Sequence, residues 1–257
     1  MSDDDRYRAP ALDKGLDMLE LLAEIDGGLT QAEIAKSLGR TPNELYRMLD
    51  RLQKRGYVTR IDGDRFALTL KMFGLAQLHA PTRRLVSYAT PLMRELAEKA
   101  RQAVHLAVFD RGQVVVIAQQ EAPDYWGISV RVGSHISLFD TGSGHILLAF
   151  NTPERREMMI TENRVDVGRS IPASLSERFN RIREQGFESM PSAQTAGVFN
   201  LSAPILAGDG DAIAALTIPY IPLVNSADAP DMSDCTHLLL ATCQKLSEMA
   251  GMREDAA

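Results

Sequence analysis

The sequence predicts an α+β protein made of two structural units. The chain has 257 residues with 45% hydrophobic content, which is enough for two separate cores. Closely spaced helix-capping signals followed by a hairpin signal occupy its first part, whereas strand-like runs and helices alternate irregularly in the rest. We therefore place a first unit at residues 1–69, a linker helix region at 70–84 and a second unit at 85–257.

Three short helices are predicted in the first unit. Apolar residues spaced three and four apart favour a helix over residues 9–24. Residues 30–33, Thr-Gln-Ala-Glu, form a capping box for a second helix that runs to Leu38. Residues 41–44, Thr-Pro-Asn-Glu, repeat this signal with proline at the first helical position, so a third helix begins at Pro42 only two residues after Gly39.

A hairpin is predicted directly after the third helix. Two strand-like runs, 57–61 and 65–68, flank an Asp-Gly-Asp turn. Two capped helices joined by a short turn and followed by a hairpin are the plan of a winged helix-turn-helix, in which the second helix of the pair enters the major groove of DNA.

The local charge agrees with this interpretation. Residues 36–71 hold nine basic and four acidic residues, although the whole chain has a net charge of -6. Side chains on the outer face of the third helix can contact bases or phosphates, and arginines in the turn and wing can contact phosphates. The residues we expect at DNA are Arg40, Thr41, Asn43, Tyr46, Arg47, Arg51, Arg60 and Arg65.

The second unit combines helices with antiparallel strands. Helices are expected at 70–79, from about 85 to 101 after an interruption at Pro81, and at 141–150, 153–160, 174–185 and 231–252. The helix at 174 opens with another capping box, Ser-Leu-Ser-Glu. Strands are expected at 105–109, 113–118, 128–132, 198–206 and 212–218. Tight turns between neighbouring strands imply hairpins and therefore antiparallel pairing.

Composition indicates the cellular location of the protein and whether it binds metals. Cys235 and Cys243 lie eight residues apart in one apolar periodic segment, which supports neither a disulfide scaffold nor a zinc cluster. The acidic start has no apolar segment of signal-peptide type, and no stretch has the length of a membrane span. We expect a cytoplasmic protein with no metal, no cofactor and no contact with membranes.

Several segments in order resemble the IclR (isocitrate lyase regulator) family of bacterial transcription factors. In the first unit they are Gly28–Gly39, Tyr46–Leu49 and Arg55–Val58; in the second they are Arg131–Gly133, Thr141–Gly144, Ile146–Ala149 and Ala203–Ile205. The resemblance covers nearly the whole chain. It implies a GAF-like antiparallel-sheet effector domain joined by a linker helix to the winged helix, and homodimers or homotetramers that bind a palindromic operator.

A helix N-terminus made of Thr141–Gly144 offers unpaired N–H groups and a hydroxyl, as an anion or carboxylate site requires. The alternative is that its glycines serve only helix–sheet packing. The resemblance implies that Gly142 and Ser143 grip a carboxylate, that Asn200 and Thr217 add polar groups, and that Tyr125, Ile128, Ile136 and Val198 form the apolar lining.

This chain departs from the family pattern at the predicted pocket. Met190 replaces a usual acidic residue, Pro219 replaces a serine, and Ser192, Ala193 and Gln194 stand where a Glu pair is usual. These changes predict a more apolar pocket that takes a larger carboxylated metabolite, aromatic acids included.

Two other functions are compatible with the sequence. Ser143 lies between glycines and the chain has five histidines, as a serine hydrolase needs, but the Gly-x-Ser-x-Gly elbow is absent. We expect His145 to lie on the surface or to face the helix dipole. A ligand-sensing protein-interaction module that touches no DNA is the second alternative. We expect a ligand-responsive transcriptional regulator and no enzyme, and the sequence leaves repressor and activator equally open.

Overall fold

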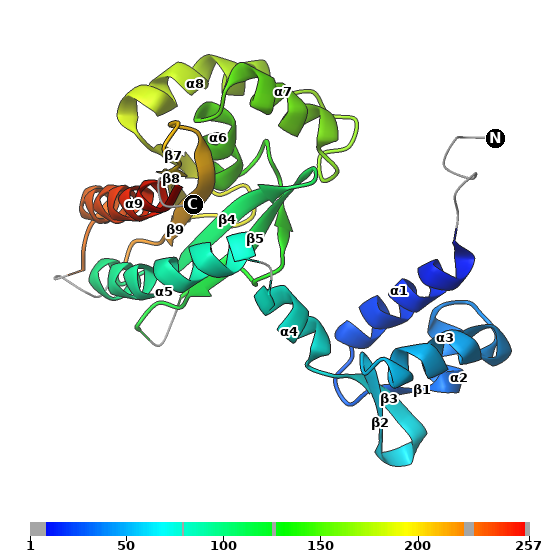
Figure 1. Cartoon of the computed structure of the whole chain (residues 1–257). Helices are drawn as coiled ribbons and strands as arrows, with labels where there is room; N and C mark the ends of the chain where they lie inside the picture. The colour runs from blue at the N-terminus through cyan, green and yellow to red at the C-terminus, as the bar shows by residue number, and fades with distance from the viewer. Residues whose placement is uncertain (1–8, 79, 125–126, 224–228, 255–257) are drawn as a thin grey trace. The chain divides into compact units, whose positions relative to one another are not determined.

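The computed structural model describes residues 9–78, 80–124, 127–223 and 229–254 (Figure 1). The chain divides into two compact units, residues 1–83 and 84–257. The second unit thus begins one residue before the position expected from the sequence, and the linker residues 70–83 group with the first unit. Within the described residues, no helix is both long and apolar enough to cross a membrane.

In its described residues, the first unit has four α-helices, one 3-10 turn and a small sheet. Its elements are α1 (Pro10–Ala23), β1 (Leu29–Thr30), α2 (Gln31–Ser37), α3 (Pro42–Lys54), β2 (Val58–Ile61), the 3-10 turn η2 (Asp62–Asp64), β3 (Arg65–Leu68) and α4 (Lys71–Leu78). The strands are antiparallel in the order β1-β3-β2. Met18, Ile34, Leu45, Leu49 and Phe66 form the core between the helices and the sheet.

Capping boxes fix the starts of α2 and α3, and the second of them borders the sharp turn between these helices. The Glu33 carboxylate accepts from the Thr30 N–H at 2.8 Å, and the Glu44 carboxylate accepts from the Thr41 N–H at 2.9 Å. The Thr41 backbone bond is the main reason why the pKa of Glu44 falls to about 2. Gly39 has a φ of +62°, a left-handed conformation that favours glycine. The turn expected from the capping signals is therefore present.

The second unit is built on one six-stranded antiparallel sheet of order β6-β5-β4-β9-β8-β7. Its strands are β4 (Val104–Asp110), β5 (Gln113–Gln120), β6 (His135–Ile136), β7 (Glu188–Pro191), β8 (Phe199–Leu206) and β9 (Ala212–Tyr220). Its helices are α5 (Ala80–Ala100), α6 (Gly142–Ala149), α7 (Pro153–Glu162), α8 (Ala173–Gln185) and α9 (Met232–Glu254). The expected α+β class is correct.

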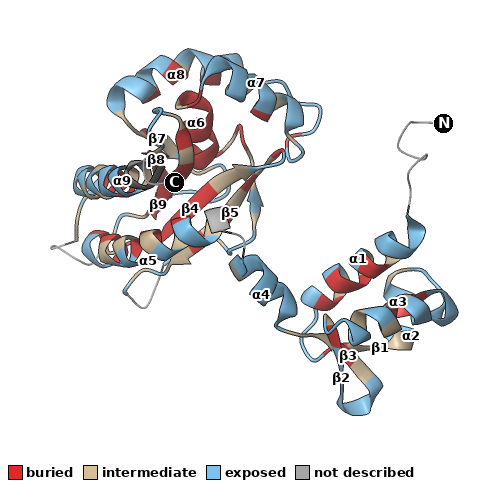
Figure 2. Ribbon diagram, viewed as in Figure 1, coloured by how far each residue is buried: buried red, intermediate tan, exposed pale blue. Residues whose placement is uncertain are grey.

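The sheet separates two hydrophobic cores. On one face, Leu106 and Leu216 pack with residues of α5 and α9, among them Met93. On the other face, Ala107 and Ala215 pack with residues of α6, α7 and α8. Every residue of α6 is buried, so this helix is enclosed between the sheet and the outer helices (Figure 2). Alternate residues of each central strand therefore serve different cores.

Some sequence expectations for the second unit are wrong. Residues 128–132 form no strand. The backbone N–H and carbonyl of Val116, at the outer edge of β5, bond instead to Ser134 and Gly133 in the turn at 131–134, and the short β6 follows this turn. Pro81 lies in the first turn of α5, so this helix begins at Ala80 and not at about residue 85, and Pro91 lies inside it. The expected capping box at Ser174 is also absent, since α8 begins one residue earlier.

Candidate DNA-binding surface and ligand cavity

The outer face of α3 is polar and basic. Leu45 and Leu49 are buried against the core, while Asn43, Tyr46 and Arg47 are exposed, and Tyr46 is 61% exposed. Arg51 is exposed one turn further along the helix, and Arg40 and Thr41 are exposed in the preceding turn. The Thr41 hydroxyl donates to Glu44 at 2.9 Å. The structure thus gathers six of the eight residues expected at DNA on this helix and its turn.

The two remaining arginines lie on the wing and differ from each other. Arg60 is exposed, with its Nη2 2.7 Å from Asp64 Oδ1. Arg65 is half-buried: its Nε and Nη2 donate to the carbonyl oxygen of Gly28 at 3.1 and 3.0 Å, and its Nη2 lies 3.3 Å from Glu33 Oε2. Arg65 therefore connects the wing to Gly28 and Glu33 and is not a free cation of the wing. This structural role of Arg65 was not predicted from the sequence.

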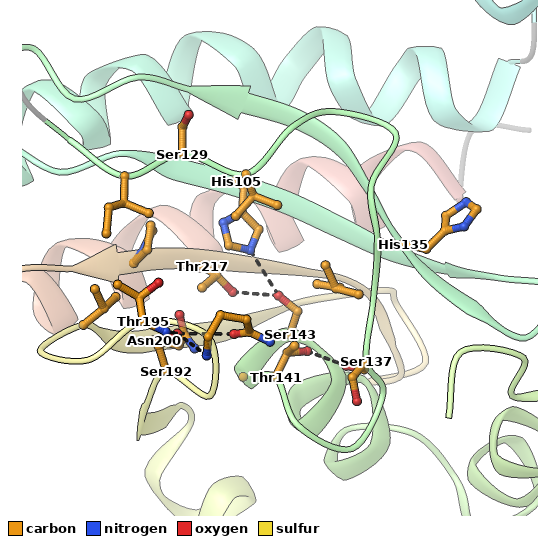
Figure 3. A pocket seen from close by; sticks show the side chains of 17 residues that line it. His105, Ser129, His135, Ser137, Thr141, Ser143, Ser192, Thr195, Asn200 and Thr217 are labelled. Carbon is orange, nitrogen blue, oxygen red and sulfur yellow. Dashed lines mark hydrogen bonds between the residues drawn. The ribbon is translucent and has the colours of Figure 1, made fainter. Parts of the chain in front are cut away.

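The second unit contains a cavity of about 370 Å³ between the sheet and the N-terminus of α6 (Figure 3). Most of its accessible lining is apolar, and hydroxyl groups, two amides and two imidazoles add polar positions. The described lining residues are His105, Ile128, Ser129, Val130, His135, Ile136, Ser137, Thr141, Gly142, Ser143, Ser192, Gln194, Thr195, Val198, Asn200, Thr217 and Pro219.

Eight of the ten residues expected at the effector line this cavity: Ile128, Ile136, Gly142, Ser143, Val198, Asn200, Thr217 and Pro219. Tyr125 lies outside the described residues. Met190 is not in the described lining, because it pairs with Asn200 from the edge strand β7, one strand further out. Met190 is therefore not among the described side chains that border the cavity.

The N-terminus of α6 supplies two free backbone donors. Thr141 caps the helix by accepting from the Gly144 N–H at 3.1 Å. Within the described residues, the N–H groups of Gly142 and Ser143 have no acceptor. A β-carbon on Gly142 would overlap the Ser202 hydroxyl, and one on Gly144 would overlap the Leu138 carbonyl oxygen. These glycines thus let the helix start close to its neighbours, and helix–sheet packing and donor supply coexist.

A row of hydroxyl groups leads from the sheet to this helix end. Ser202 Oγ lies 2.7 Å from Thr217 Oγ1, which lies 2.9 Å from Ser143 Oγ. Ser143 Oγ is in turn 3.5 Å from Nε2 of His105 (Figure 3). Burial lowers the pKa of His105 to about 4, so its ring is neutral at pH 7. Sequence reasoning missed His105, because only the pairing of β4 with β9 brings it beside Ser143.

Two polar clusters hold the walls of the cavity. The buried carboxylate of Asp166 accepts from the Ser137 hydroxyl at 2.7 Å and the Leu138 N–H at 3.0 Å, which fixes the loop before α6. Behind α6, His145 lies 3.6 Å from Glu188, which pairs with Arg178. Of the two positions expected for His145, the surface is excluded, because this residue is 3% exposed.

An exposed basic helix in a winged unit and an anion-compatible cavity in a second unit define the class of ligand-responsive DNA-binding regulators. Comparisons with known proteins agree. The family model for the bacterial transcriptional regulator IclR C-terminal matches residues 79–248, and the model for the IclR helix-turn-helix domain matches residues 11–62.

Individual relatives extend over most of the chain. The HTH-type transcriptional regulator BhcR of Paracoccus denitrificans is 30% identical over 252 residues, which cover 96% of this chain and 89% of BhcR. The transcriptional repressor IclR of Escherichia coli is 23% identical, covering 81% of this chain and 78% of IclR.

Solved structures show the same fold. Pseudomonas aeruginosa HmgR has a TM-score of 0.73 at 21% identity, covering 95% of this chain and all of HmgR. An IclR homologue from Microbacterium hydrocarbonoxydans, solved with 4-hydroxybenzoate, has a TM-score of 0.74 at 20% identity, with 93% and 98% of the two chains covered. The chain belongs to the IclR family of bacterial transcriptional regulators.

Proposed function

We propose that α3 binds in the major groove of duplex operator DNA and that a small organic acid in the cavity changes the affinity of this binding. The observation that carries the proposal is that one chain holds both an exposed basic helix and a cavity bordered by unpaired helix N–H groups. The first provides phosphate and base contacts, and the second provides donors for a carboxylate.

The DNA contacts we propose use Arg47, Arg51 and Asn43 at base edges or phosphates, with Tyr46 beside them. Arg40 and Thr41 in the turn, and Arg60 on the wing, are placed at phosphates. Arg60 must give up its ion pair with Asp64 when it contacts a phosphate. This loss reduces the net contribution of Arg60 to the free energy of DNA binding.

The effector we propose is a carboxylic acid held by Gly142 and Ser143. The 370 Å³ cavity lies within the usual range for small-molecule sites. The 4-hydroxybenzoate in the Microbacterium hydrocarbonoxydans homologue supports an acid of that kind for this chain too. Ser192 and Gln194 line the cavity from the loop where family members usually have acidic residues, so they add neutral polar contacts.

We also propose a cytoplasmic homodimer or homotetramer. Support comes from exposed apolar side chains on two helices of the first unit: Leu12 and Leu16 on α1, and Phe73 and Leu78 on α4, the last being 71% exposed. A second copy that covers these side chains would also present two winged helices to a palindromic site.

A serine hydrolase is the alternative that one contact favours, because Ser143 Oγ lies 3.5 Å from His105 Nε2. The chemistry argues against it. A ring with a pKa of about 4 is a weak base at neutral pH, and within the described residues no acid partners its Nδ1. An esterase assay of the wild type and Ser143→Ala separates the cases: a catalytic serine loses turnover on substitution, whereas a ligand-binding serine loses only effector affinity.

The decisive experiment is selection of bound duplexes from genomic DNA fragments at low ionic strength, followed by acid screening at the selected sites. The proposal expects specific fragments whose binding is lost in Arg47→Ala/Arg51→Ala. If the purified protein binds no duplex with or without acids, the proposal fails. An interaction module without DNA binding would instead keep every measurable activity in the double variant.

A further inference from the structure

A cluster of three polar side chains joins α6 to the edge of the sheet and to an outer helix. His145 lies on α6, Glu188 begins β7 and Arg178 lies on α8. His145 and Glu188 are each 3% exposed. Arg178 Nη2 donates to Oε1 of Glu188, and Oε2 of the same carboxylate lies 3.6 Å from Nδ1 of His145. None of the three is among the described lining residues, so the proposed ligand site does not account for this cluster.

Both ring nitrogens of His145 face hydrogen-bond acceptors. Nε2 lies 2.8 Å from the carbonyl oxygen of Phe139, which can only accept, so Nε2 carries a proton. Nδ1 faces Oε2 of Glu188, and within the described residues neither of these two buried atoms has a hydrogen-bond partner. A neutral ring has a single N–H, so either tautomer directs one nitrogen lone pair at an oxygen. A second ring proton removes this repulsion and gives both unpaired atoms a partner.

The surrounding charges place this second proton on the ring. Arg178 favours the ionised form of Glu188, so the carboxylate accepts and His145 donates. Asp140, in the loop before α6, adds a further negative charge that acts on His145, although it is itself paired with Arg169 at 3.0 Å. The N-terminal end of the α6 dipole opposes a cation here and Arg178 repels it, so the two carboxylates must outweigh both effects.

Within the described part of the chain, the other elements packed against α6 bring no further ionisable group to His145. These elements are α7, β4, β8 and β9. β8 has no ionisable side chain, and the one on β9, Tyr220, belongs to the core on the opposite face of the sheet. Three ionisable side chains contact the two ends of α6 instead: Arg156 of α7, Arg183 of α8 and His105 of β4. The charge of His145 therefore depends on the cluster and on Asp140.

We propose that His145 is a cationic positioning residue: its Nε2–H holds the Phe139 carbonyl, its Nδ1–H holds Glu188, and together these bonds fix the end of α6 that borders the cavity. Phe139 lies in the loop that ends at the Thr141 cap, and β7 continues into the loop that brings Ser192 to the cavity. The protonation of His145 follows from its contacts alone, whereas its effect on acid binding rests on the proposed function.

Loss of the second proton should weaken acid binding. The bare Nδ1 would then repel the Glu188 carboxylate, which drives α6 and β7 apart, and a positive charge near the bound carboxylate would disappear. Above pH 6 the described cavity lining has one other histidine that can titrate, His135, because His105 is already neutral. The contribution of His135 must therefore be tested separately.

NMR of the full-length protein with 15N-labelled histidine tests the protonation directly. The signals of His145 are assigned by their absence in His145→Gln. We expect protons on both ring nitrogens at pH 7 and loss of the Nδ1 proton as the pH rises toward 9. A bare Nδ1 at pH 7, or a ring that still holds both protons at pH 9, overturns the inference.

Two neighbouring side chains should shift this titration in opposite directions. Glu188→Gln removes the carboxylate partner, so the second proton should leave at a lower pH, by at least about one pH unit. Arg178→Gln removes a repelling cation, so the proton should leave at a higher pH. The matched control, Arg181→Gln, removes an exposed arginine from the same helix and should cause no shift. Shifts of the same sign in both cluster variants would indicate a general loss of packing and would overturn the inference.

Calorimetric titration at pH 6.5 and pH 9 tests the effect on acid binding. The probe is the one of benzoate, pyruvate and glyoxylate that binds most tightly at pH 6.5, since each ionises only at its carboxyl group and well below this range. For the wild type we expect at least about fivefold weaker binding at pH 9, the low end of typical coupling between sites. His145→Gln, whose amide does not titrate, should show the same affinity at both pH values, while His135→Gln should keep the pH dependence.

The outcomes separate this inference from the proposed function. If the ring loses its second proton without a change in acid affinity, or if the pH dependence survives in His145→Gln, the inference fails and the proposed function stands. If no acid in this set or in the operator screen binds the wild type, the proposed function fails, and the NMR titrations still decide whether His145 is charged. Thermal melting checks the folding of each variant, and if Glu188→Gln is unfolded, Arg178→Gln still gives the sign of the shift.

Discussion

His105 connects the stability of the second unit to pH. In the unfolded chain its pKa is 6.5, whereas burial holds it at about 4 in the folded protein. Between these values the unfolded chain binds a proton that the folded protein does not, so stability is complete above pH 6.5 and falls as the pH drops toward 4. The ring faces hydroxyl groups and, in the described lining, no charged side chain that could offset this effect.

We predict that wild-type protein loses about 2 to 3 kcal/mol more unfolding free energy than His105→Gln between pH 7 and pH 4.5. Urea titration of the full-length protein at both pH values, with the transition of the second unit followed separately, measures the difference. The carboxylates titrate in both proteins and therefore cancel. Parallel pH dependence in the two proteins would show that His105 is not held neutral by burial.

Arg65 and Arg60 allow a second comparison between single residues. Arg65 donates to the Gly28 carbonyl and is only 38% exposed, whereas Arg60 is 54% exposed and its ion pair with Asp64 is a surface contact. We predict that Arg65→Ala lowers the unfolding free energy of the first unit by about 1 to 2 kcal/mol and Arg60→Ala by less than about 1 kcal/mol. Thermal and urea unfolding would detect this, and the reverse order would contradict the structural role of Arg65.

These residues also show the limit of sequence reasoning at this scale. Cavity residues on glycine-rich or strand motifs, such as Gly142 and Thr217, could be proposed from the sequence because resemblance gave them a position. The structural role of Arg65 could not be predicted, since the carbonyl oxygen that accepts its hydrogen bond belongs to a residue 37 positions away in the sequence. His105 was missed because only the pairing of β4 with β9 brings it beside Ser143.

At the scale of elements, α3 is the part that should make DNA binding depend on salt. Each arginine that neutralises a phosphate adds to the release of counterions. We predict that Arg47→Ala and Arg51→Ala each weaken binding to the selected operator and, where the side chain contacts a phosphate, reduce the slope of log affinity against log salt by about 1. Fluorescence anisotropy over a salt series measures both quantities.

The control for this series is Arg181→Ala, which removes an exposed arginine from α8 of the second unit. It changes the net charge by the same amount and should leave the slope unchanged. If Arg181→Ala changes the slope as much as the α3 variants, binding responds to total charge and α3 is not the reading helix.

Helices with strong local signals could be predicted well, and edge strands could not. The starts of α2 and α3 follow from capping residues that act within four positions. Residues 128–132 have a strand-like composition, yet the turn at 131–134 makes the hydrogen bonds at the outer edge of β5. This competition depends on tertiary structure and cannot be predicted from composition. β7 was missed for a related reason: it is short and gains its structure from pairing with β8.

For the whole molecule, the proposed coupling between cavity and operator must be reciprocal. If a saturating acid changes operator affinity by a given factor, saturating operator must change acid affinity by the same factor, since both follow from one coupling free energy. We predict a factor of about 5 to 150, which corresponds to about 1 to 3 kcal/mol. Anisotropy with and without acid, and calorimetry with and without operator, measure the two sides.

Ser143→Ala gives the matched variant for that cycle. It removes the hydroxyl that contacts Thr217 and His105 but leaves α3 unchanged. We expect weaker acid binding with unaltered operator affinity in the absence of acid. If acid binding and its effect on operator affinity are unchanged in Ser143→Ala, the acid acts without contacting this serine.

The change from capped helices to mixed strands and helices predicts two units, and the compact units of the structure meet at residues 83 and 84, with the predicted linker grouped in the first. The cavity as a whole was less predictable. Its lining comes from segments spread between residues 105 and 219 that adjoin only after the sheet has formed, and the strand order places Met190 on an edge strand, outside the described lining.

Along β4 and β9 the side chains alternate between the two faces of the sheet, and this alternation is useful for the design of new biosensors. Positions 105, 217 and 219 face the cavity, whereas their immediate neighbours 106, 216 and 218 belong to the opposite core. A library that randomises the first set can search for new inducers while the scaffold that keeps the protein folded stays untouched.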